Sequence, residues 1–358
     1  MRLGILTFHR AHNYGAVLQT YALQQCLQSM GHDVWVIDYR QPQIEIAYRP
    51  FRLRTWLSSV IHVRKTAFSY LKGYPLRKKR QKNFVNFVNS YLHLTSPCSK
   101  DNIPDDFDVY LIGSDQLWNW ACTANIIDPV YTGNIGKNTS GKIVGYAISS
   151  KLAAIDTIGV KGLKETLDKF SAISIREDMV AKVMGCLTGT TPEVCCDPTI
   201  LTNSSFWDKI TNEKYKNRKY VLMYEVRKPK GNPKYLLNKA KELAEQMGCE
   251  VINASRGDYA VEDWVSLFKY ASYVVTTSFH GTVFSLIFHR PFYSIKLKDR
   301  GDSRYENLLE AIGAYDFCVD MDFKPVAKKL DYTLINEGIK NYRSGSLKFL
   351  MNLQGVGG

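Results

Sequence analysis

Apolar residues along the chain alternate between short continuous runs and stretches with helical spacing. Residues 2–8 form an apolar run typical of a buried strand. Residues 14–30 then carry apolar side chains at helical spacing, and Gly31 behind them is a natural helix stop. Residues 34–37 form the next apolar run. This β-α-β pattern predicts that the chain opens a parallel, doubly wound sheet.

The pattern continues in two series up to about residue 312. Further strands of the first series are predicted over residues 109–112, 142–148, 172–175 and 194–196. The second series predicts strands over 220–224, 250–253, 273–277 and 292–295, and helices over 232–247, 261–270, 282–288 and 303–312. We therefore predict an α/β protein with Rossmann-like domains over 1–196 and 197–322. A C-terminal helical tail over 323–358 is expected to pack back on the N-terminal domain.

The positive charge of the chain is concentrated in one segment. The chain has 47 Lys and Arg against 34 Asp and Glu, for a net charge of +13. Residues 46–100 contain twelve of the basic residues and no acidic residue, so the rest of the chain is almost neutral. This distribution argues against a general nucleic-acid-binding protein, but it is compatible with a local polyanion site.

The basic segment is predicted to hold two helices, over 51–70 and 77–91, in which apolar side chains alternate with Lys and Arg. Such helices suit an anionic membrane face, because basic residues are attracted to acidic headgroups. A solvated basic face over an ordinary core is the alternative interpretation.

The predicted cellular compartment rests on the lack of a signal-peptide core and of a membrane-spanning segment in the sequence pattern. The N-terminal apolar run ends at His9, which is too short for a signal-peptide core. Residues 271–288 contain no Lys, Arg, Asp or Glu, but their polar residues favour a strand, a turn and a helix over a membrane span. The eight cysteines show no metal-ligand spacing. We expect a cytoplasmic protein without a metal, peripheral at the inner face of the plasma membrane through its basic segment.

The strongest candidate for a functional site is the stretch TTSFHGT at residues 276–282. It lies between a predicted strand and a predicted helix, where the free N–H groups of a helix N-terminus favour an anion. Gly281 allows the backbone to approach a ligand closely, and His280 is suited to proton transfer near neutral pH. A histidine that only packs and hydrogen-bonds locally is the alternative.

Two further strand ends carry candidate residues. Residues 9–15 form the turn after the first strand, where Asn13 can cap the following helix and the loop can line a site. Arg176 ends another predicted strand, and its planar fork suits a phosphate or carboxylate. An ion pair of Arg176 with Glu177 or Asp178 is the structural alternative.

A fourth strand end has the sequence GSDQ at residues 113–116. Gly113 and Ser114 suit close approach to a ligand. Asp115 can act as a base, accept a hydrogen bond from a hydroxyl group, or simply form the turn. The chain has no GxGxxG, P-loop, GxSxG or HExxH motif, which excludes the simplest dehydrogenases, kinases, serine hydrolases and zincins.

Taken in order, these segments resemble the polysaccharide pyruvyl transferase family. The matching segments are ILTF at 5–8, NYGAVLQ at 13–19, GSDQ at 113–116, YA at 146–147, SIRE at 174–177, DPT at 197–199 and TSFHG at 277–281. The resemblance covers about residues 3–315.

The resemblance implies a fold similar to glycosyltransferases, with two facing Rossmann-like domains in the GT-B manner and residues 46–100 as a basic helical insert in the first. It implies transfer of pyruvate from phosphoenolpyruvate, as a ketal, to hydroxyls of a sugar in a cell-surface polysaccharide or its lipid-linked precursor. Phosphate is released, and phosphoenolpyruvate is a co-substrate, so no cofactor is expected.

The resemblance also assigns roles to residues. His280 is the expected acid/base residue, and Arg176 is the expected ligand of phosphoenolpyruvate. The other candidates for phosphoenolpyruvate are Ser278, Gly281 and Arg304, and those for the acceptor side are Asn13, Tyr14, Gly15, Gly113, Ser114 and Asp115. Two other functions stay open on the sequence: a nucleotide-sugar-dependent glycosyltransferase of the same fold, and a non-catalytic relative that binds carbohydrate or anions.

Overall fold

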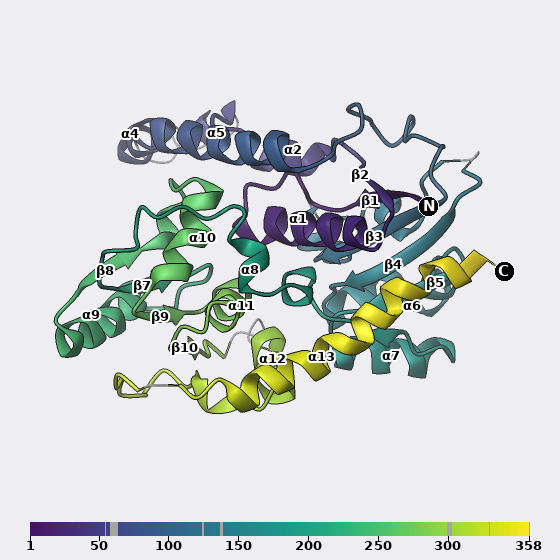
Figure 1. Cartoon of the computed structure of the whole chain (residues 1–358). Helices are drawn as coiled ribbons and strands as arrows, with labels where there is room; N and C mark the ends of the chain where they lie inside the picture. Colours follow the sequence, from purple (N-terminus) through teal and green to yellow (C-terminus); the bar gives the residue numbers. More distant parts are fainter. Residues whose placement is uncertain are drawn as a thin grey trace. The chain divides into compact units, whose positions relative to one another are not determined.

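The chain folds into two compact units in a computed structural model (Figure 1), which describes residues 1–53, 55–57, 64–123, 125–136, 139–298, 303–328 and 330–357. The first unit contains residues 1–201 and 346–358, and the second contains residues 202–345. Each unit is built on its own parallel sheet. The predicted pair of α/β domains is therefore confirmed.

The first unit has a six-stranded parallel sheet in the order β2-β1-β3-β4-β5-β6. Its strands are β1 (Arg2–Leu6), β2 (Asp33–Val36), β3 (Val109–Asp115), β4 (Lys142–Ile148), β5 (Ala172–Ile175) and β6 (Glu193–Val194). The strand order reverses between β1 and β3. The carboxyl ends of parallel strands open a crevice at such a switch point, where doubly wound sheets bind their ligands.

Helices pack on both faces of this sheet. They are α1 (Tyr14–Ser29), α2 (Pro42–Ala47), the second half of α5 (Tyr74–Tyr91), α6 (Leu152–Leu167) and α7 (Asp178–Thr188), with short 3-10 turns at Trp120–Cys122, Pro129–Thr132 and Pro198–Leu201. The described side chains of α4 (Arg64–Lys72) and of the first half of α5 are not buried. The core lies between these helices and the apolar strands. It includes the buried side chains of Trp118 and Tyr131.

The second unit repeats the design with a five-stranded parallel sheet in the order β11-β10-β9-β7-β8. Its strands are β7 (Tyr220–Tyr224), β8 (Glu250–Asn253), β9 (Tyr273–Thr276), β10 (Phe292–Ile295) and β11 (Cys318–Val319). Its helices are α8 (Ser204–Trp207), α9 (Tyr235–Met247), α10 (Val261–Tyr270), α11 (Phe279–Ile287) and α12 (Ser303–Ala311). The order reverses between β7 and β9, which is the switch point of this sheet.

The last helix, α13 (Thr333–Met351), begins in the second unit and ends in the first (Figure 1). Within the first unit, the Ser346 hydroxyl accepts a hydrogen bond from the backbone N–H of Cys196 at 2.8 Å. The ring of Phe349 lies 6.1 Å from that of Tyr146, measured between centroids. The C-terminal residues thus pack on the first unit beside Cys196 and Tyr146.

The basic segment contains α4 and α5. Helix α5 covers the predicted helix over 77–91 and starts earlier, at Tyr74, because Pro75 is well tolerated in a first helical turn. The helix predicted over 51–70 lies partly outside the described residues, and α4 occupies Arg64–Lys72. That the segment is an insert stays a prediction. Among the described helices, none combines the length and the apolar character needed to cross a bilayer.

Candidate active site

The SFHG motif, residues 278–281, forms the turn from β9 into α11. Ser278 has extended backbone angles and caps α11, since its side-chain oxygen accepts from the N–H of Gly281 at 3.4 Å. The Thr282 hydroxyl donates to the carbonyl of Ser278 at 3.1 Å and closes the same turn. Helix α11 therefore begins at Phe279, so His280 and Gly281 lie in its first turn and not in the predicted loop.

Gly281 is required by the packing of this turn. A Cβ at this position would lie 2.9 Å from Cβ of Thr276 and closer still to its hydroxyl. That hydroxyl donates to the carbonyl of Tyr224 at 2.7 Å and accepts from the N–H of Ser278 at 3.0 Å. The close approach that Gly281 permits in this structure is to Thr276 of the protein itself.

His280 is presented at the switch point of the second sheet. It is the second residue of α11, it is half-buried, and its ring lies edge-on to that of Phe279 with the centroids 5.2 Å apart. The first turn of a helix carries N–H groups without an acceptor inside the helix, and the helix dipole is positive there. The motif thus combines an imidazole with a region of positive potential.

Glu225 borders the same switch point, and the sequence analysis missed it. It follows β7 directly, and the preceding carbonyl, that of Tyr224, accepts the N–H of Thr277 at 3.3 Å. Its side chain is 5% exposed, and Lys228 Nζ lies 3.4 Å from Oε1. Burial raises the pKa of this carboxyl, although Lys228 acts in the opposite direction. A charged residue immediately after an apolar strand was the signal that could have found it.

The loop after Glu225 is bound to the motif as well. The Thr277 hydroxyl donates to the carbonyl of Arg227 at 3.0 Å, and Arg227 Nη2 donates to the carbonyl of Thr277 at 3.4 Å. The predicted residue Arg304 is the second residue of α12 and is half-buried. Lys296 forms an ion pair with Asp320 at 3.6 Å.

Arg176 joins three of the predicted segments in the first unit. Its Nη2 lies 2.8 Å from Oδ2 of Asp197 in the DPT segment, and it also donates to the hydroxyl of Ser114 in the GSDQ segment. The side chains of Arg176 and Asp197 are 4% and 0% exposed. The guanidinium therefore has a buried counter-ion, and it fixes the end of β3 through Ser114.

The ion pair expected of Arg176 with Glu177 or Asp178 is wrong. Glu177 accepts from the Ser149 hydroxyl and from the N–H of Ser150, and Asp178 pairs with Lys182 at 2.6 Å. The reason is geometric, because Arg176 ends β5 inside the sheet and reaches across neighbouring strands, whereas Asp178 already belongs to the exposed first turn of α7.

The GSDQ turn is shaped by contacts within the sheet. Gly113 has φ of 137°, and a Cβ there would lie 2.9 Å from the carbonyl carbon of Tyr146 in β4. Ser114 is fully buried. Asp115 is the last residue of β3, which extends three residues beyond the strand predicted over 109–112, and its Oδ1 accepts from the N–H of Gln116 at 2.7 Å.

Asn13, Tyr14 and Gly15 start α1 beside the switch point of the first sheet. The Asn13 side chain accepts from the N–H of Ala16 at 3.4 Å, as predicted for a capping residue. Tyr14 packs on Phe84 of α5 with centroids 5.0 Å apart. The Thr7 hydroxyl donates to the carbonyl of Ser114 at 2.9 Å and links the ends of β1 and β3.

A buried ionic cluster that the sequence analysis missed supports this loop. Asp38 accepts from His9 Nε2 at 3.0 Å and from Arg10 Nε and Nη2 at 2.8 and 2.7 Å, and Arg40 Nη2 lies 3.0 Å away. Burial raises the pKa of the Asp38 carboxyl, but the hydrogen bonds from His9 and Arg10 outweigh it and hold this pKa well below its usual range. The cluster ties the loops after β1 and β2 together.

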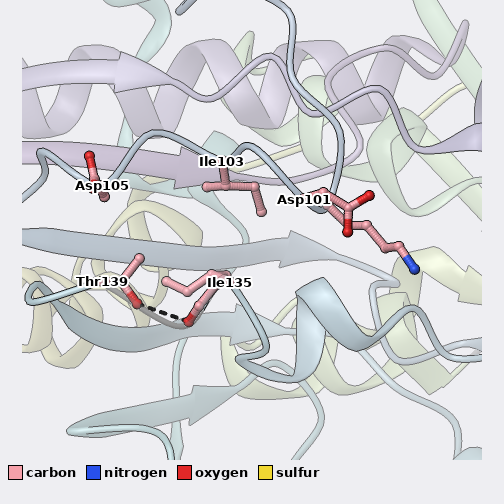
Figure 2. Close-up of a pocket in the computed structure, with 7 residues that line it drawn as sticks. Asp101, Ile103, Asp105, Ile135 and Thr139 are labelled. Atoms are coloured by element: carbon pink, nitrogen blue, oxygen red, sulfur yellow. Dashed lines mark hydrogen bonds between the residues drawn. The ribbon is translucent and has the colours of Figure 1, made fainter.

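A pocket of about 430 Å³ lies elsewhere in the first unit (Figure 2). It is lined by Lys100, Asp101, Ile103, Asp105, Ile135, Gly136 and Thr139. It contains none of the predicted site residues, and its two carboxylates against one ammonium group are unsuited to an anionic substrate. In the described part of the chain, no group of three or more His, Cys, Asp or Glu side chains could hold a metal ion.

A family model with the description "Polysaccharide pyruvyl transferase" matches residues 13–299, which is most of the chain. The chain belongs to the polysaccharide pyruvyl transferase family. It is therefore a pyruvyl transferase, and the resemblance seen in its ordered segments is confirmed. The match to this pyruvyl transferase family includes Asn13, Arg176 and His280, whereas Arg304 lies beyond it.

Solved structures with similar arrangements include three carbohydrate-active enzymes. The glycosyltransferase SsfS6 of Streptomyces sp. SF2575 has 13% identity and a TM-score of 0.36, covering 98% of this chain and 94% of its own. The UDP-GlcNAc 2-epimerase of Methanocaldococcus jannaschii has 12% identity and a TM-score of 0.44, covering 100% of both chains. The E. coli heptosyltransferase WaaC has 14% identity and a TM-score of 0.33, covering 82% of this chain and 88% of its own. These values are too low to support an inference about the pyruvyl transferase. No curated protein matches the chain.

Proposed function

We propose that this pyruvyl transferase takes its pyruvyl group from phosphoenolpyruvate. It places the group as a ketal on two hydroxyls of a sugar in a cell-surface polysaccharide or its lipid-linked precursor, on the cytoplasmic side of the membrane. The observation that carries the proposal is the capped N-terminus of α11, which presents His280 at the switch point of the second sheet. Phosphoenolpyruvate has both a carboxylate and a phosphate, and helix N-termini favour such anions.

The chemistry begins with protonation of C3 of phosphoenolpyruvate by His280, which leaves C2 electrophilic. A sugar hydroxyl attacks C2 and loses its proton to a base. Phosphate then leaves from C2, and the second hydroxyl closes the ketal ring with loss of its own proton. Ser278 and the first turn of α11 stabilise the anion, and Gly281 lets that turn stay compact. No cofactor is needed for these steps.

The first unit supplies the acceptor side in this proposal. Residues 13–15 and 113–115 border the carboxyl ends of β1 and β3, where a doubly wound sheet binds its ligands. The contact of Arg176 with phosphoenolpyruvate stays a prediction. Its buried pair with Asp197 favours a positioning role, in which Arg176 holds Ser114 and through it the GSDQ turn.

The test is pyruvyl transfer by His280→Ala. General acid catalysis contributes about 10²–10⁴ in rate, so kcat is expected to fall by that factor while the unfolding midpoint stays near that of the wild type. The assay follows phosphate release from phosphoenolpyruvate in the presence of candidate glycans, together with the mass of the product. His289→Asn is the matched control, because His289 is exposed on the same unit, has a φ of 52° that Asn tolerates, and is expected to be silent.

Near-normal transfer by His280→Ala would overturn the role of this histidine. Titration of the wild type with phosphoenolpyruvate and with UDP-sugars separates the remaining functions. Binding of the nucleotide sugar alone would favour a glycosyltransferase, and binding without any phosphate release would favour a non-catalytic relative.

A further inference from the structure

The stretch from residue 45 to residue 83 exposes large apolar side chains on the first unit. None of its described side chains is buried. Its exposed large apolar residues are Ile46, Phe51, Leu53, Leu57, Phe68, Leu71, Tyr74 and Leu76. Phe68 reaches 72% exposure. Soluble monomers rarely expose apolar side chains in such numbers on one segment, so this surface is expected to have a partner.

Among the described residues, polar and aromatic contacts, and not buried apolar side chains, hold this segment together; the ring of Phe51 lies 6.3 Å from that of Trp56 and 6.0 Å from that of Tyr70, measured between centroids. Arg77 of α5 donates to the carbonyls of Pro50 and Tyr70 at 2.8 and 2.6 Å, and its guanidinium lies 4.1 Å from the centroid of the Tyr70 ring. The Tyr70 hydroxyl in turn accepts the N–H of Arg52 at 2.8 Å. Helix α4 is followed by α5 after Gly73 alone, so the two helices run end to end, and their described side chains from residue 68 to residue 83 include none that is buried.

Buried apolar side chains anchor only the second half of α5 on the unit, whereas in the first half Arg80 donates to the carbonyl of His12. Phe84, Phe87 and Val88 are the buried residues of this helix, and the rings of Phe87 and Tyr21 of α1 lie 6.0 Å apart. The first half of α5 has no buried side chain. Residues 68–72 of α4 and this half of α5 thus present a surface without a buried side chain.

The charge of the segment selects the partner. No acidic residue occurs between residues 46 and 100, and Lys72, Lys78, Lys79 and Lys82 are all exposed. An anionic lipid surface complements both features, because acidic headgroups attract the lysines and the interface accepts the apolar side chains. A second copy of the chain would bring two basic segments face to face in a two-fold dimer, which their like charge disfavours.

We propose that residues 46–53, 55–57 and 68–83 dock the protein on an anionic membrane surface. Phe68 and Leu71 enter the interface between headgroups and acyl chains, and Lys78 and Lys79 lie over acidic headgroups. The proposal does not depend on the pyruvyl transfer reaction, since it concerns binding to lipid without substrate.

The experiment is flotation of the full-length protein with vesicles of phosphatidylcholine alone or mixed with phosphatidylglycerol. Binding is expected only to the mixed vesicles and is expected to fall as salt is added, because the Debye length shortens. Each basic residue near an anionic surface changes the partition coefficient by roughly fivefold, so Lys78→Ala with Lys79→Ala is expected to weaken binding about 25-fold. Phe68→Ser with Leu71→Ser is expected to weaken binding at every salt concentration.

The matched controls lie on the second unit. Lys234→Ala with Lys241→Ala removes two exposed charges, and Leu334→Ser removes a side chain that is 75% exposed. Both controls are expected to bind like the wild type. Equal binding to neutral and mixed vesicles, or an equal loss in controls and segment variants, overturns the proposal. A dimer in light scattering that Phe68→Ser with Leu71→Ser converts to a monomer also overturns it, because a second copy would then cover the surface.

Discussion

Replacing Asp38 by Asn tests the ionic cluster beneath the His9–Asn13 loop. The Asp38 side chain is 2% exposed. Its negative charge is compensated by the guanidinium groups of Arg10 and Arg40, which lie at hydrogen-bond distance. Breaking a buried pair by removing one partner costs about 3–5 kcal/mol, because the remaining charges stay buried. Arg40 is 39% exposed and can turn to water, so we expect about 3 kcal/mol. With an m-value of about 2–3 kcal/mol/M, the urea midpoint of the first unit falls by roughly 1–1.5 M.

The matched control is Asp33→Asn, since Asp33 is 57% exposed and lies 3.6 Å from Arg2 Nε. Such an exposed pair contributes about 0–1 kcal/mol. The pH dependence has a definite sign, because the folded pKa of Asp38 is depressed below its unfolded value of about 3.9. The stability that Asp38 contributes is thus present above about pH 4 and is lost as the pH falls through the folded pKa. A midpoint shift no larger than that of Asp33→Asn, or a gap between wild type and variant that closes already near neutral pH, would refute this account.

Two further predictions concern the motifs of the site. Gly281→Ala forces a Cβ against Thr276, so overpacking of about 1–3 kcal/mol is expected to lower the thermal midpoint of the second unit and to reduce pyruvyl transfer; unchanged unfolding would contradict the tight turn. The pKa of His12 is lowered to about 4, chiefly by burial and then by Arg80 and Arg10, so the folded state loses stability as the pH falls from about 6.5 towards 4. His12→Gln is expected to remove this loss in urea titrations, and equal pH dependence in the variant and the wild type would exclude it.

The sheets could be predicted from the sequence because their strands are buried on both faces. Apolar-rich runs over 220–224 and 292–295 coincide with β7 and β10, whose residues are all buried, whereas β8 at 250–253 is an edge strand with an exposed Glu250. Helix α6 escaped prediction because Gly159 breaks its periodicity with a φ of 71°. The start of α11 was placed too late because the cap at Ser278 depends on a side-chain hydrogen bond and not on an apolar pattern.

The sequence pattern located the candidate site residues at strand ends, but it did not predict which side chains contact one another. Parallel strands bring their carboxyl ends to one edge, and this placed the candidate residues of GSDQ and SIRE at strand ends, but the contact of both segments with DPT through Arg176 was not predicted. The partner of Arg176 could not be read from its neighbours in the sequence, because Asp197 reaches it from the strand beyond. The Asp38 cluster could not be predicted for the same reason, because the pairing of β1 with β2 brings His9 and Asp38 together.

The path of α13 affects the order in which the protein can mature. A ribosome makes residues 1–201, then the whole second unit, and only then residues 346–358 of the first. Domains generally fold as they emerge, so the second unit can finish folding while the first still lacks the helix end that carries Ser346 and Phe349. A fragment ending at Leu201 would keep Cys196 and Tyr146 without these neighbours, whereas residues 202–345 are continuous in the chain. The unit that starts synthesis is thus the one that is completed last.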